Sequence, residues 1–157
     1  MDLERLYKEN YRIVFGYLLS LCEDPHFADD LTSETFLRGI QSIGRFKEGR
    51  ISTWLCAIGR NLYLNEVKRR KHHVPLEDAF HLETEGFEQE LLDKVQARQI
   101  SVLAHALEEP QKSVFFMRLH GMSFREIGEA LGKNENWARV TFFRVKRDII
   151  ARLEETR

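Results

Sequence analysis

The stretch MSFREIGEALGKNENWARVTFFRVKR, residues 122–147, decides the fold of the second half of the chain. Ser123 and Glu126 have the spacing of a capping box, which predicts that a helix begins after Ser123. Apolar side chains then recur at helical intervals, at Phe124, Ile127, Ala130 and Leu131. Gly132 can end this helix in the left-handed conformation, and Asn134 is a favourable N-cap for the next one. The stretch therefore predicts two helices joined by a tight turn.

The second of these helices has two different faces. Its apolar side chains recur at intervals of four, three and four residues and predict a buried stripe, formed by Ala138, Phe142, Val145 and Ile149. Largely off that stripe lie Arg139, Phe143, Arg144 and Arg147. A helix that buries one face and presents arginines on the other suits the major groove of DNA. A solvated surface helix is the alternative, but solvation explains neither the glycine-containing turn nor an exposed Phe143. We therefore predict a helix-turn-helix that binds DNA.

The composition is that of a helical protein with a core. The chain has 157 residues, of which 43% are hydrophobic and 31% charged, and it holds only three prolines and nine glycines. This length suits one ordinary domain or two small ones. The net charge of −1 hides a local segregation, because cations cluster at 68–71 and 139–152 while acidic residues dominate 77–93.

Neither a secretory nor a membrane signal is visible. Cys22 and Cys56 lie far apart and form no CxxC pair, so buried free thiols in a reducing compartment are expected rather than a disulfide or a metal site. The first residues, MDLERLYKEN, do not resemble a signal peptide, and no apolar run is long enough to span a membrane. We expect a cytoplasmic protein without membrane insertion.

The first 43 residues predict two helices. Apolar residues recur through 2–22, and Asp24-Pro25 provides an N-cap and a first-turn proline for a helix that extends to about Ile43. Its inward side is expected to include Phe27, Leu31, Thr35 and Ile40, and its outward side Asp29, Asp30, Ser33, Glu34 and Arg38. Such an acidic face suits a basic partner surface, although on most helices it is merely solvated.

A third helix follows a loop at 44–52 and carries the second cationic cluster. Ser52 is its expected N-cap, and its expected buried stripe is Trp54, Leu55, Ile58, Leu62 and Val67. On or near its surface are expected Arg60, Asn61, Asn65, Lys68, Arg69 and Lys71. Asparagine is unfavourable inside helices, so two of them four residues apart suggest hydrogen bonds to a partner. Bonds from each amide to nearby backbone are the alternative. The terminal KRRK can contact phosphates without reading sequence.

An acidic linker is predicted to divide the chain. Between Glu77 and Asp93 there are seven acidic residues and no Lys or Arg, with Pro75 and Gly86 as breaks. The predicted organisation is a helical domain at 1–73, a flexible linker at 74–90 and a second helical domain at 91–157 that contains the helix-turn-helix. The fold class is therefore all-α, with two small domains.

Three segments in this order resemble a sigma factor of bacterial RNA polymerase, of the extracytoplasmic-function group. DDLTSETFLRG (29–39) resembles the segment that binds core polymerase. FKEGRISTWLCAIGRNLYLNEVKRRK (46–71) resembles the segment that melts and reads the minus-ten element. LEEPQKSVFFMRLHGMSFREIGEALGKNENWARVTFFRVKR (107–147) resembles the domain that reads the minus-thirty-five element. The resemblance covers residues 3 to 153.

The resemblance implies a role for each group of residues. Contact with the clamp helices of the largest polymerase subunit is implied for Asp30, Ser33, Glu34 and Arg38. Contact with minus-ten DNA is implied for Lys47, Arg60, Asn61, Asn65, Lys68, Arg69 and Arg70, with Asn61 holding a flipped-out base and the loop 46–52 walling its pocket. Contact with minus-thirty-five DNA is implied for Arg139, Val140, Phe143, Arg144 and Arg147.

The resemblance also implies the partners. These are core RNA polymerase, including the flap of its second-largest subunit, promoter DNA and a cognate anti-sigma factor. No catalytic constellation, cofactor motif or metal-ligand cluster is recognisable, so the implied function is promoter recognition and strand opening without enzymatic activity. A stand-alone helix-turn-helix regulator and a sigma-like protein that does not open DNA are the alternatives.

Four residues depart from the family pattern. Asn136-Trp137 replaces the glycine-threonine pair that usually starts the recognition helix, and Val140 and Thr141 replace more polar residues. Trp137 either packs between helices, which we favour, or stacks on the sugar-phosphate backbone.

Overall fold

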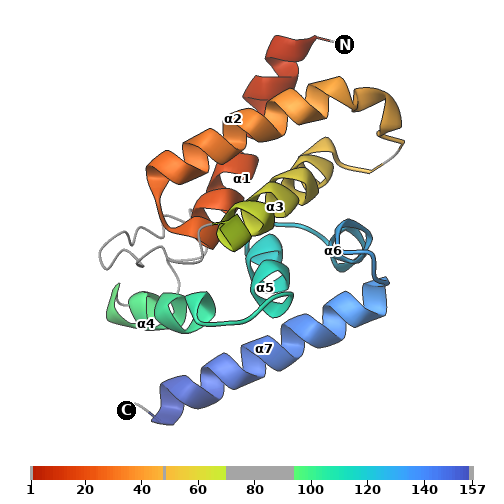
Figure 1. Ribbon diagram of the computed structural model, residues 1–157. Coiled ribbons are helices and arrows are strands. Elements are labelled where there is room, and N and C mark those ends of the chain that lie inside the picture. Colours follow the sequence, from red (N-terminus) through yellow and green to blue (C-terminus); the bar gives the residue numbers. More distant parts are fainter. Residues whose placement is uncertain (1, 48, 70–93, 156–157) are drawn as a thin grey trace. The chain divides into compact units, whose positions relative to one another are not determined.

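A computed structural model describes residues 2–47, 49–69 and 94–155 of the chain (Figure 1). The helices are α1 (Leu3–Cys22), α2 (Pro25–Gln41), a short 3₁₀ helix η1 (Ile43–Arg45), α3 (Ile51–Arg69), α4 (Lys94–His105), α5 (Gln111–Leu119), α6 (Phe124–Ala130) and α7 (Glu135–Glu155). No strand occurs in these ranges, which confirms the predicted all-α fold.

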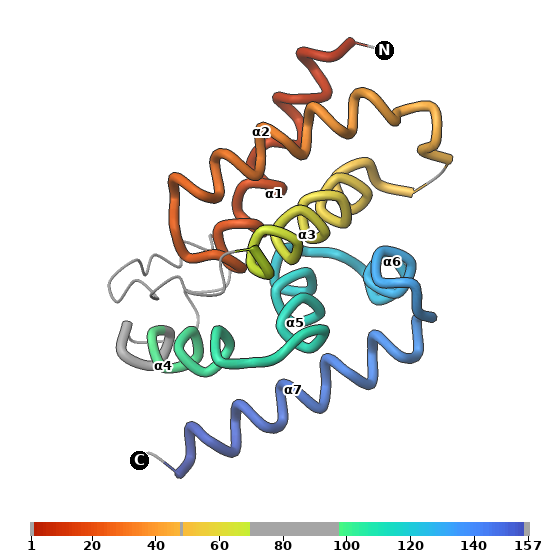
Figure 2. Tube along the Cα trace, viewed as in Figure 1, coloured from red at the N-terminus to blue at the C-terminus, as the bar shows by residue number. Residues whose placement is uncertain are grey.

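The chain divides into two compact units, Met1–His81 and Leu82–Arg157. Figure 2 follows the trace of the chain through each of them. The predicted acidic linker at 74–90, the predicted helix start near Leu91, and Arg70 and Lys71 of the cationic cluster lie outside the described residues.

The first unit is a bundle in which α1, α2 and α3 each contact the other two. Its core consists mainly of Val14, Tyr17, Leu18, Leu21, Ala28, Leu31, Phe36, Leu55 and Cys56. The side chain of Asp24 accepts hydrogen bonds from the backbone N–H groups of His26 and Phe27, and Pro25 opens α2, as predicted. Both cysteines are free, and burial raises the pKa of Cys56 well above its usual range, so this thiol is a core residue rather than a nucleophile.

The start of α3 and its buried face differ from the prediction. The helix begins at Ile51, so Ser52 lies in the first turn and is buried instead of capping the helix. The predicted loop is shorter as well, because η1 occupies its first residues. Of the large apolar residues expected to be buried, Leu55 is buried, Trp54, Ile58 and Leu62 are half-buried, and Val67 is 43% exposed.

Small residues make the actual contact between α3 and the rest of the bundle. The buried face of α3 holds Ser52, Thr53, Cys56 and Gly59 beside Leu55. A Cβ atom on Gly59 would lie 2.9 Å from Oγ1 of Thr35 and 3.0 Å from Leu18, and one on Gly39 of α2 would lie 2.5 Å from Leu55. The helices therefore approach one another more closely than side chains larger than glycine at these positions would permit.

In the second unit, α7 contacts α4, α5 and α6. Its core consists of Ala104, Val114, Phe115, Phe116, Met117, Met122, Ile127, Ala138, Val145, Ile149 and Leu153. The predicted stripe of α7 is therefore confirmed, with Phe142 half-buried and stacked on Phe115 at 6.0 Å between ring centroids.

The two helices of the predicted helix-turn-helix, α6 and α7, begin where the sequence predicts. Ser123 and Glu126 form both hydrogen bonds of a capping box, 2.9 and 3.1 Å long. Gly132 has a φ of +70°, in the left-handed region, and the side chain of Asn134 accepts a 2.7 Å hydrogen bond from the backbone N–H of Trp137. The turn also packs against α6, because the backbone N–H of Lys133 donates to the carbonyl of Gly128 at 2.7 Å.

Candidate nucleic-acid interface

The outer face of α3 presents two amides and a row of cations. Asn61, Asn65 and Lys68 are exposed and follow one another at intervals of four and three residues, opposite the small buried residues of the helix. Arg69 is exposed as well and forms a 3.1 Å ion pair with Glu66. Arg60 is half-buried beside this row. The structure therefore brings three of the predicted minus-ten residues, Asn61, Asn65 and Lys68, to one face of α3.

The segment before α3 is attached to the helix by an aromatic contact. Phe46 and Trp54 lie 5.4 Å apart between ring centroids, and both are half-buried. Lys47, the next residue, is exposed. Gly49 has a φ of +103°, a conformation that glycine adopts without strain. Lys47 is thus presented to solvent on a segment whose aromatic neighbour is packed on α3.

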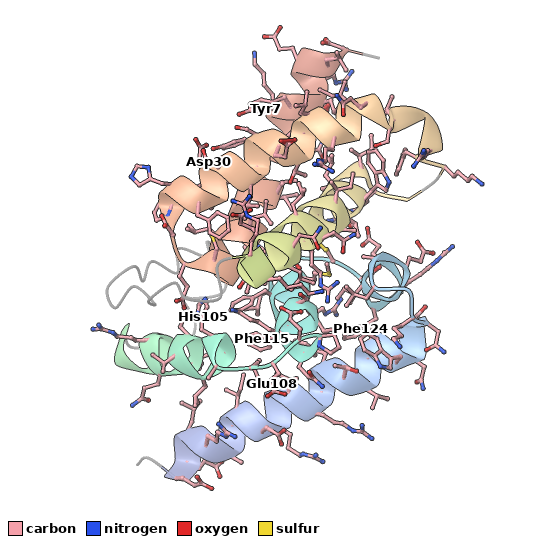
Figure 3. All side chains as sticks on the ribbon, viewed as in Figure 1. Tyr7, Asp30, His105, Glu108, Phe115 and Phe124 are labelled. Carbon is pink, nitrogen blue, oxygen red and sulfur yellow. The ribbon has the colours of Figure 1, made fainter. Side chains whose placement is uncertain are left out.

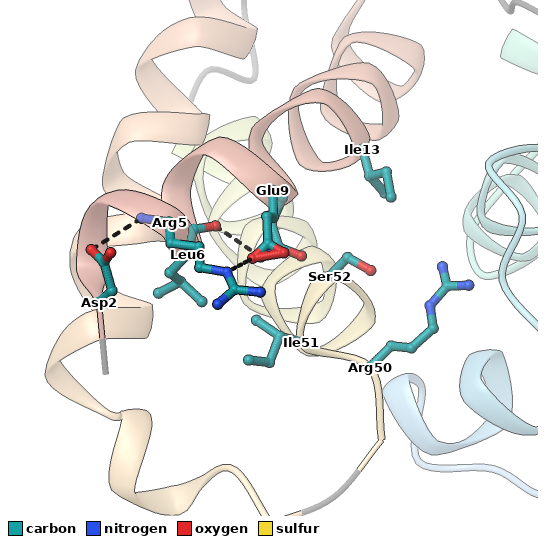
Figure 4. Close-up of a pocket in the computed structure, with 9 residues that line it drawn as sticks. Asp2, Arg5, Leu6, Glu9, Ile13, Arg50, Ile51 and Ser52 are labelled. Atoms are coloured by element: carbon teal, nitrogen blue, oxygen red, sulfur yellow. Dashed lines mark hydrogen bonds and ion pairs between the residues drawn. The ribbon is translucent and has the colours of Figure 1, made fainter.

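An open groove of about 660 Å³ lies between the start of α1 and the start of α3 (Figure 4). It is lined by Asp2, Arg5, Leu6, Glu9, Asn10, Ile13, Arg50, Ile51 and Ser52. Arg5 and Glu9 form a 2.7 Å ion pair inside it, and its two cations are matched by two carboxylates. Ser52 lies roughly 14 Å along the helix from Asn61 at 1.5 Å per residue. This groove is therefore separate from the amide-bearing face.

The second candidate surface is the outer face of α7. Arg139, Val140, Phe143, Arg144 and Arg147 are all exposed, as predicted. Asn136 is exposed at the N-terminal end of the same face, one turn before Val140. Trp137 is half-buried, with the Lys133 ammonium 5.7 Å from its ring centroid.

The ring of Phe124, labelled in Figure 3, contacts two arginines of the helix-turn-helix unit. The guanidinium carbon of Arg118 lies 4.1 Å from the centroid of its ring, and that of Arg139 lies 5.5 Å away. Arg118 also donates a 3.0 Å hydrogen bond to the carbonyl of Met122. Arg139 additionally forms a 2.6 Å ion pair with Glu135, one turn earlier. The side chain of Arg139 is thus held in place before any ligand arrives.

Sequence reasoning assigned Phe124 only to the apolar face of its helix. Its contacts with Phe142 and Phe143, at 5.8 and 5.9 Å between ring centroids, join the two helices. The sequence shows that this unit is rich in aromatic residues, which indicates that some of the rings contact one another. Which rings form pairs depends on how α6 and α7 cross, and the sequence does not show that crossing.

The outer face of α2 carries the residues predicted to contact polymerase. Asp30, Ser33 and Arg38 are exposed, Glu34 is half-buried, and Arg38 lies 3.5 Å from Glu34 (Asp30 is labelled in Figure 3). Leu37, which the sequence prediction left out, is 53% exposed on the same helix. Leu37 follows Asp30 by seven residues, which places it on the same side of the helix.

Neither a metal-binding cluster nor a membrane-spanning helix occurs in the described ranges. Among residues 2–47, 49–69 and 94–155, no group of three or more His, Cys, Asp or Glu side chains could hold a metal ion. No helix within the same ranges is long and apolar enough to cross a membrane.

These features define a class of protein: two helical units, of which one presents amides and cations on a single helix and the other a cationic helix-turn-helix. Residues 6–73 match the family Sigma-70 region 2, and residues 97–149 match Sigma-70, region 4. The chain belongs to the sigma-70 family of RNA polymerase sigma factors.

Individual relatives are similar over different lengths. The chain is 31% identical over 78 residues to the ECF RNA polymerase sigma factor SigM of Bacillus subtilis, a match that covers 50% of this chain and 48% of SigM. It is 30% identical over 152 residues to the ECF RNA polymerase sigma factor BldN of Streptomyces coelicolor, covering 92% of this chain and 58% of BldN. The chain therefore spans about half the length of these relatives.

A solved structure shares the fold. The sigma factor RpoE of Bartonella quintana, in complex with the anti-sigma factor NepR, matches with a TM-score of 0.74 at 17% identity, and the match covers 99% of both chains.

Proposed function

We propose that the protein binds core RNA polymerase, directs it to specific promoters and begins strand opening, without catalysis of its own. The observation that carries this proposal is the exposed row of Asn61, Asn65 and Lys68 on α3, in a unit that matches region 2. A stand-alone regulator has no need of such a row, because its helix-turn-helix alone would position it on DNA. The region 2 match therefore favours the polymerase subunit.

The amide row suits single-stranded DNA. An asparagine side chain both donates and accepts hydrogen bonds, so Asn61 can pair with the edge of a base that has left the duplex. Lys68 and Arg69, about two turns further along the helix, can hold the displaced backbone. Strand opening needs no ATP if the free energy of these contacts exceeds that of unstacking the bases, roughly a few kcal/mol per base.

The face of α7 suits the duplex upstream. A helix with exposed arginines can enter the major groove, where Arg144 or Arg139 can pair with guanine and Arg147 with phosphate. The two surfaces lie in different units of the chain. We infer that α7 positions the protein on the minus-thirty-five element and that α3 captures the opened minus-ten strand.

Two protein partners follow from the same proposal. The face formed by Asp30, Ser33, Glu34, Leu37 and Arg38 would contact the clamp helices of the largest polymerase subunit, and the helix-turn-helix unit would contact the flap of the second-largest subunit. The complex of RpoE with NepR supports an anti-sigma factor as a further partner, because the fold is shared.

Run-off transcription with core polymerase tests the proposal. Purified protein and core enzyme are incubated with a library of genomic fragments, and transcripts are mapped at their 5′ ends. We expect transcripts that begin at a limited set of positions sharing two upstream elements. If the protein yields no promoter-dependent transcript above core enzyme alone, the proposed function is wrong.

A further inference from the structure

The outermost part of α7 is apolar at its centre. Successive residues of an α-helix are rotated by about 100°, so Asn136, Val140, Phe143 and Arg147 line one face, opposite the buried Ala138, Val145 and Ile149. The two middle members of this row are exposed hydrophobic side chains, with Val140 37% and Phe143 49% exposed. The centre of the face is therefore apolar, whereas its ends and flanks are polar or cationic.

Phe143 is held in a fixed position on this face. Its ring lies edge-on to Phe142, with the centroids 5.4 Å apart, and 5.9 Å from Phe124. The ammonium of Lys146 lies 5.8 Å from its centroid. These contacts cover about half of the ring and leave the other half to a ligand, so little conformational entropy is lost when a ligand binds.

The charges around the pair identify the ligand as DNA rather than an apolar protein surface. Arg139, Arg144 and Arg147 flank Val140 and Phe143 and are exposed. An apolar partner that covered the pair would also remove these cations from water without neutralising them, which is costly. In the major groove the same cations meet phosphates and guanines.

Within the major groove, the C5-methyl group of thymine is the apolar feature that distinguishes one base from another. We propose that Val140 and Phe143 together read thymine methyl groups in the upstream promoter element, so that thymine at one or two positions of this element is a condition of recognition. This inference rests on the proposed function, since it assumes that α7 enters the duplex. It assigns base specificity to two apolar residues and leaves the arginines for guanine and phosphate contacts.

The test compares thymine with uracil, which lacks only the C5-methyl group. Core polymerase with the full chain first selects a sequence from a promoter library that is randomised across the upstream element. The selected duplex is then synthesised with deoxyuridine in place of each thymine of that element in turn, and the affinity of the holoenzyme is measured for each duplex. We expect a loss of about fourfold for each methyl group contacted, the value for removing one buried methyl from an apolar contact.

Variants assign this effect to the two side chains. For Val140→Ala, and separately for Phe143→Ala, we compare the affinity for the thymine duplex with that for the uracil duplex. The ratio of these affinities should fall toward one at the base position that the substituted side chain contacts. Ile150→Ala is the matched control, because Ile150 is an exposed apolar residue of the same helix at 45% exposure, seven residues beyond Phe143, and should preserve the full difference. Because Val140 is exposed and alanine favours helices, we expect Val140→Ala to fold. This variant can therefore test the proposal even if Phe143→Ala misfolds.

Failure of this inference differs from failure of the proposed function. A selected element that lacks thymine, or a holoenzyme whose affinity does not change with uracil, overturns methyl reading while promoter-dependent transcription persists. A uracil effect that both variants retain overturns the assignment to Val140 and Phe143. Absence of any promoter-dependent transcript overturns the proposed function itself.

Discussion

The backbone carbonyl oxygen of Asn134 lies 2.6 Å from the position that a Cβ atom on Gly128 would occupy. Gly128 is in the middle of α6, and Asn134 is the residue that caps α7. The two helices of the helix-turn-helix therefore meet backbone against backbone at this point. A backbone atom cannot move aside as the end of a flexible side chain can, so any residue with a Cβ atom at this position would force the two helices to shift.

Gly128→Ala should consequently destabilise the second unit. Overpacking costs about 1–3 kcal/mol, and alanine recovers about 0.5–1 kcal/mol through its better helix propensity. Hydrogen exchange of the amides in α6 and α7 measures the net loss. Gly44→Ala is the matched control, because nothing lies within 4 Å of its Cβ position. Equal protection of α6 and α7 in wild type and Gly128→Ala would contradict the prediction.

Glu135→Gln should strengthen binding to DNA. Glu135 holds Arg139 in a 2.6 Å ion pair and adds a negative charge to a surface that is expected to face phosphates. Its removal should raise the affinity for promoter duplex by about threefold at low salt, since such an exposed pair is worth about 0–1 kcal/mol. Fluorescence anisotropy over a range of salt concentrations measures the effect. Glu154→Gln, exposed near the end of the same helix, should change the affinity less.

The stability of the second unit should depend on pH through His120. Burial lowers the pKa of His120 from 6.5 to about 4. Between these values the unfolded chain binds a proton that the folded chain does not, so this contribution to stability is fully present above pH 6.5 and is lost as the pH falls toward 4. Urea unfolding of wild type and His120→Gln at a series of pH values measures it.

The difference in the free energy of unfolding between wild type and His120→Gln separates the effect of the histidine from that of the carboxylates, which also titrate in acid. We expect His120→Gln to remove about 2 kcal/mol of the acid-induced loss, a value reduced to allow for the part of the ring that solvent reaches. His26→Gln, which replaces an exposed histidine of α2 in the first unit, serves as the control for the substitution itself. Parallel profiles for wild type and His120→Gln would show that the prediction is wrong.

Asn61→Ala should impair strand opening and leave polymerase binding intact. The side chain of Asn61 is exposed on α3, whereas the predicted polymerase-contacting residues lie on α2. Loss of one amide pairing with a base should lower the amount of open complex about tenfold, given that a well-formed contact is worth about 1–3 kcal/mol. Permanganate reactivity of thymines in the bubble measures opening, and co-elution with core enzyme measures binding. Gln41→Ala, an exposed amide at the end of α2, is the control.

The helix-turn-helix was predictable from sequence because its ends are determined by local chemistry. The hydrogen bonds of Ser123, Glu126 and Asn134 form within three residues of each cap, and the left-handed Gly132 needs no distant partner. The outward position of Arg139, Phe143 and Arg144 then follows from the helical repeat.

The buried face of α3 could not be predicted in the same way. A search for large apolar residues selects Trp54, Ile58 and Val67, whereas the bundle buries the small residues between them. That choice depends on where Gly39 of α2 and Leu18 of α1 approach α3, which is a property of three helices together. The two rings beside Phe124 and the exposure of Leu37 were missed for the same reason.

The small residues on the buried face of α3 have a consequence for how this protein can diversify. The side chains that hold the helix, such as Cys56 and Gly59, are different from those that point outward, such as Asn61 and Asn65. In the proposed role, a change of base preference therefore requires substitutions only on the outward side, where no packing is disturbed. The same bundle interior can then carry different surface amides, each with its own base preference.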